Sequence, residues 1–127
     1  MIRLLGFYKR RADITHQQFL DHWINIHGPL VARIPGVEKY LKKYIQHRLY
    51  LDPLSQCDLL YDGFSESWWD SWEDRDTFLK LPAFDEIIED ERRFIDLGVS
   101  RWMVQDEQAL QIDVLAEWPH PFLRPAR

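Results

Sequence analysis

The first part of the chain shows two hydrophobic periods, one typical of a strand and one typical of a helix. Residues 2–9 alternate and carry branched and aromatic side chains, which predicts a β-strand. After a polar loop, Thr15 with Gln18 three positions later has the capping-box pattern of a helix start. Apolar residues then recur at helical spacing as far as a Pro-Gly pair at 35–36. We therefore predict a helix over residues 16–33.

The remaining chain predicts three more strands and two more helices. Residues 37–50 fit a helix, because two tyrosines lie four apart, or a long strand, because polar and apolar residues alternate; we favour the strand. Small residues on one face of the next strand leave room for something to approach closely. The later predicted elements are a strand over 58–70, helices over 74–81 and 83–96, and a strand over 99–106.

This order predicts the ferredoxin-like βαββαβ plan of the α+β class, in which two helices pack on one face of a four-stranded antiparallel sheet. One chain cannot cover the other face, so we expect a homodimer that packs sheet to sheet. Residues 1–106 form the predicted domain. Residues 107–127, with three prolines, form an irregular C-terminal extension that could add one short strand at 110–115.

Composition narrows the class of protein. A length of 127 residues favours one domain, and a net charge of -5 argues against nucleic acid as a partner. No run of about 18 apolar residues is present, so we expect no membrane contact, and the start lacks a signal-peptide pattern, which predicts a cytoplasmic protein. The single Cys57 excludes an internal disulfide and a cysteine-based metal cluster within one chain.

The predicted first helix carries an imidazole in its apolar face. Each residue advances about 100° around a helix, so several residues fall within about 60° of Trp23. These residues are Phe19, Ile26, His27 and Leu30. Pro29 has no N–H, so the carbonyl of Asn25 loses its helical partner beside His27. The pattern fits a functional histidine, but spacing alone favours a core histidine that hydrogen-bonds a carbonyl.

Two acidic residues lie four apart on the predicted third strand. Asp62 and Glu66 share a face with Phe64, where a carboxylate needs a partner. A structural salt bridge to Arg93 or to an imidazole is favoured, and a second acid/base group is the alternative. Trp69, at the end of this strand, could line a pocket for a flat ring.

A metal site is not favoured by the histidine spacing. His22 and His27 are five apart, about 140° around an α-helix, so they should diverge. We therefore predict no metal and place His22 at the edge of the apolar face.

Several motifs occur in an order that matches a known family. The most specific is Phe19-x-x-x-Trp23-x-x-x-His27-x-Pro29-Leu30. Weaker motifs follow it: Pro35-Gly36-Val37-x-x-Tyr40, Tyr61-Asp62-Gly63-Phe64-Ser65-Glu66-x-Trp68 and Asp90-Glu91-x-Arg93-Phe94-Ile95-Asp96. Over residues 3–106 the chain resembles EthD-type domains of the dimeric α+β barrel superfamily.

The resemblance implies a fold, a pocket and a class of chemistry. Related proteins include lactone isomerases of aromatic catabolism, polyketide cyclases and dehydratases, which use no metal or organic cofactor and place their pocket between sheet and helices. In the lactone isomerases a histidine like His27 works with a tyrosine like Tyr40. A second pocket histidine of that subgroup has no counterpart here, since Pro53 lies near its place. Haem use elsewhere in the superfamily is a minor alternative.

We therefore predict a cofactor-independent isomerase, cyclase or dehydratase that transfers protons within a small, hydrophobic, oxygenated ring compound. His27 and Tyr40 are the predicted catalytic residues. The predicted substrate-binding residues are Trp23, His22, Asp62, Glu66 and Trp69. Two alternatives are a non-catalytic binding protein of a catabolic pathway and a structural dimer whose interior is filled by its own aromatic side chains.

Overall fold

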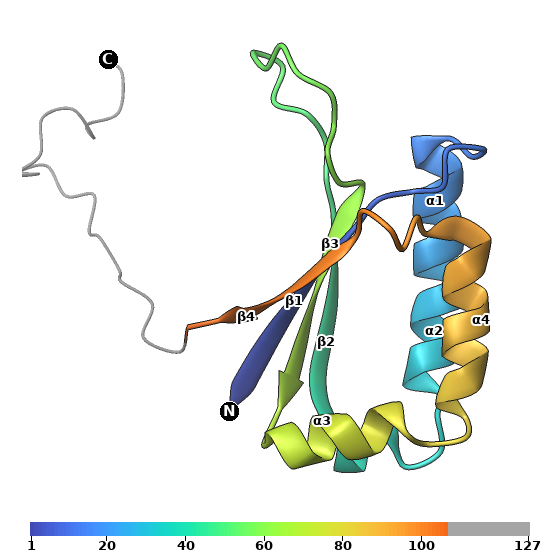
Figure 1. The fold of residues 1–127 in the computed structure, drawn as a ribbon, viewed down its shortest axis with the longest axis vertical. Coiled ribbons are helices and arrows are strands. Elements are labelled where there is room, and N and C mark those ends of the chain that lie inside the picture. Colours follow the sequence, from blue (N-terminus) through green and yellow to red (C-terminus); the bar gives the residue numbers. More distant parts are fainter. Residues whose placement is uncertain (107–127) are drawn as a thin grey trace, which may run out of the picture.

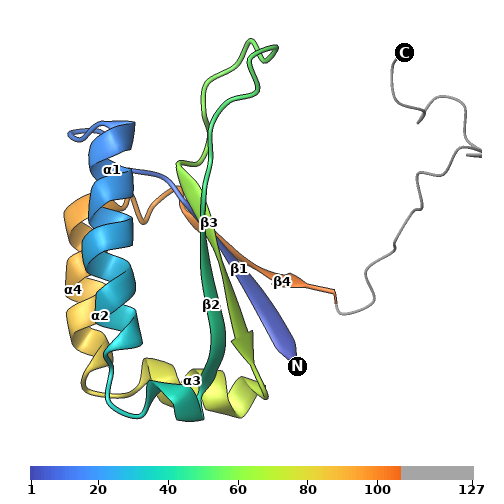
Figure 2. The same cartoon turned by 180° about the vertical axis from the view of Figure 1, so that it is seen from behind.

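The computed structural model describes residues 1–106, which form an antiparallel sheet with helices against one face (Figure 1 and Figure 2). The strand order is β2-β3-β1-β4, with β1 paired to both β3 and β4. The predicted ferredoxin-like α+β class is thus confirmed. The strands are β1 (Ile2–Tyr8), β2 (Leu41–Arg48), β3 (Gly63–Trp69) and β4 (Arg101–Gln105).

The first helix forms over the predicted residues but is not uniform. Thr15 Oγ1 accepts a hydrogen bond from the backbone N–H of Gln18, and Gln18 Oε1 accepts one from that of Thr15, so the capping box is confirmed. Directly before Pro29 the helix widens into a π-turn, with i→i+5 hydrogen bonds. The three segments are α1 (His16–His22), η1 (Trp23–His27) and α2 (Gly28–Ala32).

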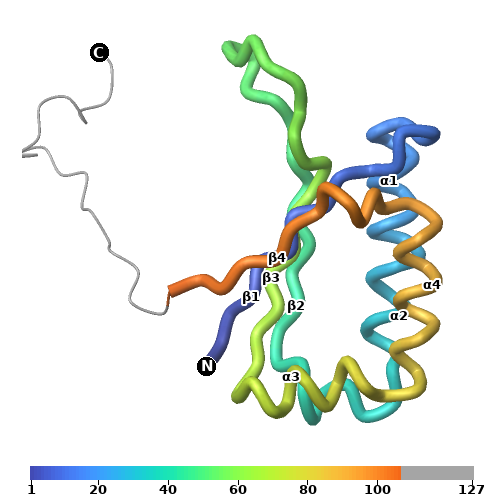
Figure 3. The backbone as a smooth tube through the Cα atoms, viewed as in Figure 1, coloured from blue at the N-terminus to red at the C-terminus, as the bar shows by residue number. Residues whose placement is uncertain are grey.

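The predicted strand over residues 37–50 is shorter in the structure. Its first residues form a 3₁₀ turn, η2 (Val37–Lys39), and residues 41–48 form β2. The choice of strand over helix is therefore confirmed for residues 41–48. α3 (Trp72–Leu79) lies across one end of the layers, and α4 (Phe84–Phe94) runs beside α1 and α2 (Figure 3).

The third predicted strand is shorter than expected. It begins at Gly63, and residues 49–62 form an arm that extends beyond the sheet (Figure 1). The backbone N–H of Asp62 donates to the carbonyl of Tyr8, so Asp62 marks the base of the arm. The predicted strand at 110–115 and the extension 107–127 lie outside the described residues.

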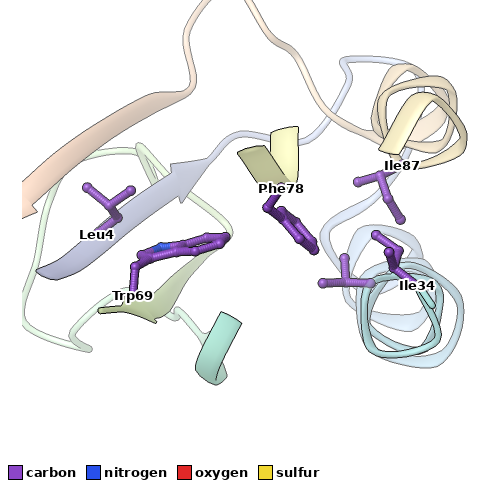
Figure 4. Close-up of a cluster of buried hydrophobic side chains, with 6 residues drawn as sticks. Leu4, Ile34, Trp69, Phe78 and Ile87 are labelled. Carbon is purple, nitrogen blue, oxygen red and sulfur yellow. The ribbon is translucent and has the colours of Figure 1, made fainter. Parts of the chain in front are cut away.

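The interior between sheet and helices contains two apolar clusters. In the first, Phe78 lies between Trp69 on the sheet and two isoleucines, Ile34 in the bend after α2 and Ile87 on α4 (Figure 4). The second cluster surrounds Trp23 at the other end of the layer. Its buried members are Tyr8, Phe19, Leu20, Trp23, Phe94 and Ile95. Burial of these large side chains provides the main stabilisation of the fold.

The opposite face of the sheet is not covered by any helix of residues 1–106. Phe64 stacks on Phe7 and on His47 there, and Arg3 lies 3.6 Å above the ring of Trp68. Across the same residues, no helix is both long enough and apolar enough to cross a lipid bilayer.

Candidate functional site

A cavity of about 540 Å³ lies between the sheet and the helices. All four strands contribute to it, and its size falls in the range of small-molecule sites. Ser65 and Ser67 on β3 line it, as the run of small residues on that strand predicted. At Gly63 the space is filled instead by Trp23, since a Cβ atom there would lie 2.4 Å from Cζ3 of the indole.

His27 lines this cavity at the end of the π-turn. Only 4% of the residue is exposed, and the prediction that its ring turns inward is confirmed. Its Nδ1 donates to Oδ2 of Asp90 over 2.9 Å. That bond leaves Nε2 as the nitrogen available to the cavity. The partner is a carboxylate on α4, and not the carbonyl of Asn25 that the sequence suggested.

The π-turn is held in place from the sheet. The backbone N–H of Gly28 donates to the carbonyl of Trp23, and Nε2 of Gln46 on β2 donates to the same oxygen over 2.9 Å. A Cβ atom at position 28 would lie 2.9 Å from Oε1 of Gln46, so glycine permits this approach. The sheet thereby fixes the turn that presents the imidazole.

The same turn overturns the expectation that His22 and His27 diverge. Winding with i→i+5 bonds brings residues five apart close to one line along the helix. Nε2 of His22 accordingly donates to Oδ1 of Asp90 over 2.8 Å, so both rings meet one carboxylate. The wider turn also turns Ile26 outward, where it is 48% exposed, although α-helical spacing placed it in the apolar stripe.

Asp90 is the buried centre of this cluster. Asp90 is 1% exposed. In addition to the two histidines, Nη1 of Arg93 donates to Oδ1 of Asp90 over 3.2 Å. Burial raises the pKa of Asp90, but the hydrogen bonds from His27 and His22 lower it by more, so the pKa lies below the usual range. Asp90 is therefore a carboxylate at neutral pH.

His27 is neutral under the same conditions. Burial lowers its pKa below the usual value, and the hydrogen bond that His27 donates to Asp90 reverses only part of that effect. A neutral imidazole whose Nδ1–H is held by a carboxylate has a free electron pair on Nε2. This arrangement can accept a proton from a molecule in the cavity.

Two tyrosine hydroxyls lie in the cavity. The Tyr8 hydroxyl is 3.0 Å from Oγ of Ser65, and the Tyr44 hydroxyl is 3.5 Å from Nε2 of Gln46. Burial raises the pKa of both tyrosines, so both remain protonated and can donate a hydrogen bond to a bound oxygen. Neither residue was singled out from the sequence.

Glu91 is the carboxyl group that lines the cavity within residues 1–106. Burial, and then the negative charge of Asp90, raise its pKa to about 7. Glu91 was not given a role in the sequence analysis. An acidic residue inside an apolar stripe was the signal that could have identified it.

Of the other predicted site residues, Trp69 lines the cavity. Its ring packs edge to face on Phe78 at 5.2 Å, and its Nε1 donates to Ser67 Oγ over 3.0 Å. Trp23 is fully buried beneath His27 and belongs to the core. Tyr40 follows the 3₁₀ turn and packs against Phe78 at 6.3 Å, outside the set of side chains that line the cavity.

The two acids predicted on the third strand also lie away from the cavity. Asp62 precedes the strand and is fully buried, where it bonds His16 Nδ1 at 2.7 Å and the backbone N–H of Arg10 at 2.9 Å. Glu66 lies on the uncovered face of the sheet, 2.5 Å from His47 Nε2. The favoured structural role fits both, although the predicted partner Arg93 bonds Asp90 instead.

No group of three or more histidine, cysteine or acidic side chains within residues 1–106 is arranged to hold a metal ion. The polar groups of the cavity are hydroxyls, one imidazole and one carboxyl, with the guanidinium of Arg75 on α3. Such a set suits acid/base chemistry and hydrogen bonding to oxygen atoms.

The comparisons with known proteins place this geometry in context. The model of the EthD domain matches residues 11–98. No curated protein matches the sequence. An EthD family protein from Bacillus halodurans has a similar structure, with a TM-score of 0.64 and 22% identity over 84% of this chain and 98% of that one.

Two further similar structures come from bacteria. A dimeric protein of unknown function with a ferredoxin-like fold from Bacteroides fragilis gives a TM-score of 0.60 at 12% identity, covering 83% of this chain and 94% of that one. A dimeric ferredoxin-like protein of unknown function from Thermobifida fusca gives 0.60 at 15% identity, covering 82% and 88%. At these identities the likeness concerns the fold.

Proposed function

This chain belongs to the EthD domain family, and we propose that it is a cofactor-independent enzyme that transfers protons within a small, hydrophobic, oxygenated ring compound. One observation carries the proposal. A neutral imidazole, held by an ionised buried carboxylate, stands at the wall of a cavity large enough for such a molecule.

In this proposal His27 is the general base. Its Nε2 takes a proton from a carbon next to a carbonyl group of the substrate, and Asp90 stabilises the imidazolium that forms. A carboxylate behind a histidine also fixes which ring nitrogen carries the proton in the resting state. Returning the proton to another carbon gives an isomer, and loss of a hydroxyl group from the enolate gives a dehydration.

Tyr44 takes the role that the sequence suggested for Tyr40. Its hydroxyl lies in the cavity and stays protonated, so it can donate to the oxygen on which negative charge develops. The Tyr8 hydroxyl, beside Ser65, is a second donor in the same wall. We propose Tyr44 as the principal donor because Nε2 of Gln46 donates to its oxygen and leaves its proton free, whereas the Tyr8 hydroxyl can spend its proton on Ser65.

The walls favour a flat, mostly apolar substrate. Trp69 and Phe78 form one end of the cavity and offer faces on which an aromatic ring packs. We therefore expect a bicyclic or substituted monocyclic ring with at least one carbonyl or phenolic oxygen. The reaction class includes isomerisation, cyclisation and dehydration.

We further propose that the protein is a homodimer through the uncovered sheet face. That face carries Phe64 and Trp68 with the ion pair of Glu66 and His47 between them. Two proteins of the same fold are described as dimeric. Light scattering at micromolar concentration should give twice the mass of 15.4 kDa, and a monomer would contradict the proposal.

The function is tested with a probe ketone. Bicyclic 2-tetralone has an acidic C–H next to its carbonyl group, and in D₂O a base that removes this proton leaves deuterium in its place. Mass spectrometry should detect catalysed exchange by the wild-type protein, and His27→Ala should reduce it at least ~100-fold. The matched control is His16→Ala, which removes another aspartate-bound histidine that does not line the cavity.

The same experiment separates catalysis from binding. Tryptophan fluorescence reports binding because Trp69 and Trp102 line the cavity. Binding of 2-tetralone and of phenols without any deuterium exchange would overturn the catalytic proposal and leave a ligand-binding protein. Exchange that survives His27→Ala would remove His27 from the mechanism.

A further inference from the structure

The cavity contains one acidic side chain that the proposed mechanism does not use. Glu91 faces the cavity from α4, in a stripe where its neighbours Ile87 and Phe94 are buried and apolar. Within residues 1–106 its carboxyl oxygens have no hydrogen-bond or salt-bridge partner. Glu91 is half-buried and lines the cavity.

This isolation distinguishes Glu91 from the other shielded acids of the protein. Asp62 has His16 and a backbone N–H, and Glu66 has His47. Asp90, the residue before Glu91, has two histidines and an arginine. A shielded carboxyl group without a partner weakens the fold, so a structural role does not account for it.

The helix turn between Asp90 and Glu91 gives them different neighbours. Successive helix positions differ by about 100°, so Asp90 faces the two histidines while Glu91 faces the sheet. There its charge acts on Tyr8 of β1 and on Tyr44 of β2, and it contributes to the raised pKa of both hydroxyls. Glu91 therefore lines the same cavity as the hydroxyl groups proposed to receive the substrate oxygen.

We propose that Glu91 is the second proton-transfer residue of the cavity, which protonates the substrate oxygen while His27 removes a proton from carbon. This inference rests on the proposed function and deepens it. Paired with His27, the carboxyl group converts a substrate carbonyl into a neutral enol, so a charged enolate does not have to persist in an apolar site.

The proposed step is the enolisation of a substrate carbonyl. The electron pair of the C–H bond becomes the C=C bond of the enol as its proton goes to Nε2 of His27. The carbonyl π electrons move to the oxygen, which takes the proton from Glu91. His27 ends as the imidazolium and Glu91 as the carboxylate, and transfer back at a second carbon restores both groups.

The protonation states required are those that the surroundings favour. Burial and the charge of Asp90 raise the pKa of Glu91 to about 7, so a large fraction is protonated at neutral pH. The other titratable groups that face it across the cavity are His27, Tyr8 and Tyr44, with the cationic Arg75 at α3. His27 is neutral, so the pair holds one proton to give and one site to accept.

The experiment measures deuterium exchange into 2-tetralone as a function of pH, after subtraction of the rate without protein. Wild type should lose activity as the pH rises through about 7, when Glu91 ionises. Glu91→Gln should lower the maximal rate ~10- to 100-fold and should abolish this alkaline limb, because the amide does not titrate. Glu91→Asp should exchange deuterium more slowly than wild type and should still lose activity at alkaline pH.

Glu86→Gln is the matched control, because Glu86 is an exposed acid of the same helix and should leave both rate and profile unchanged. Fluorescence titration with 2-tetralone should give similar affinities for wild type and Glu91→Gln. An alkaline limb that persists in Glu91→Gln would overturn this inference and leave the role of His27 standing. Absence of exchange by wild type would instead overturn the proposed function, and this inference with it.

Discussion

Asp62 and Asp90 are both buried aspartates bonded to histidine, yet only Asp90 lies beside a cavity. Asp62 is 0% exposed and accepts from His16 Nδ1 over 2.7 Å; Asp90 is 1% exposed and accepts from His27 Nδ1 over 2.9 Å. The two pairs differ in the second nitrogen of the ring. Nε2 of His16 is enclosed and lacks a partner within residues 1–106, whereas His27 lines the cavity.

The remaining partners of the two aspartates differ as well. Asp62 forms salt bridges at the base of the arm: its Oδ2 lies 3.7 Å from Lys9 Nζ and its Oδ1 lies 3.5 Å from Arg10 Nε. Asp90 gathers a second imidazole and lies next to the cavity carboxyl Glu91. A buried aspartate–histidine pair therefore has a structural role alone unless the outer nitrogen of the ring faces a cavity.

We expect the largest effect on stability from a substitution at Asp62. Asp62→Ala leaves Lys9, Arg10 and His16 without their shared acceptor, and breaking such a buried pair costs about 3 kcal/mol of the free energy of unfolding. Urea denaturation measures this. Asp13→Ala, which removes an exposed partner of Arg11, should leave it nearly unchanged. A loss at Asp62 no larger than at Asp13 would contradict the structural role.

The next effect concerns catalysis at Asp90. Asp90→Asn cannot hold the Nδ1 proton of His27 as a carboxylate does, so deuterium exchange into 2-tetralone should fall ~100-fold, about 2.7 kcal/mol in barrier height. Asp62→Asn is the control and should leave exchange per folded molecule unchanged. Equal losses in the two variants would remove the distinction between the pairs.

A third effect appears in the pH dependence of stability. The folded-state pKa of Glu91 is about 7, above the ordinary 4.5, so the folded protein retains this proton more strongly than the unfolded chain. Its contribution is therefore full below pH 4.5 and is lost as the pH rises through 7. At pH 8, Glu91→Gln should be more stable than wild type by roughly 3 kcal/mol, and at pH 4 the two should converge. A constant difference between the two curves would count against this assignment.

The smallest effect concerns His22, which contacts Asp90 from the outer side. Its positive charge contributes to the lowered pKa of His27. His22→Gln should therefore raise the pKa of His27, as an NMR titration of the ring protons would show, and should keep most of the exchange activity. A large loss of exchange would place His22 among the catalytic groups.

Local patterns predicted the elements because their causes are local. The capping box of Thr15 and Gln18 and the alternation of residues 41–48 depend on near neighbours, and both are confirmed. The inward turn of His27 also followed from helical spacing, because four positions make close to one full turn in both α-helical and π-helical winding.

The partners of His27 could not be predicted, because they depend on packing between distant segments. Asp90 is 63 residues away in sequence, and no spacing rule connects the two. Tyr44 lines the cavity while Tyr40 does not, because the chain enters β2 only after the 3₁₀ turn and an irregular register at Leu41. Both distinctions arise from the three-dimensional arrangement.

The π-turn gives one helix two angular phases. Before it, Phe19 and Trp23 point into the apolar cluster; after it, the helix resumes with a rotated phase that suits the cavity. The fold thus contains the equivalent of a one-residue insertion in a regular helix. Deleting a single residue between Trp23 and His27 would restore uninterrupted α-helical winding and keep the following residues close to their present phase, while removing the wide turn whose Trp23 carbonyl accepts from Gln46.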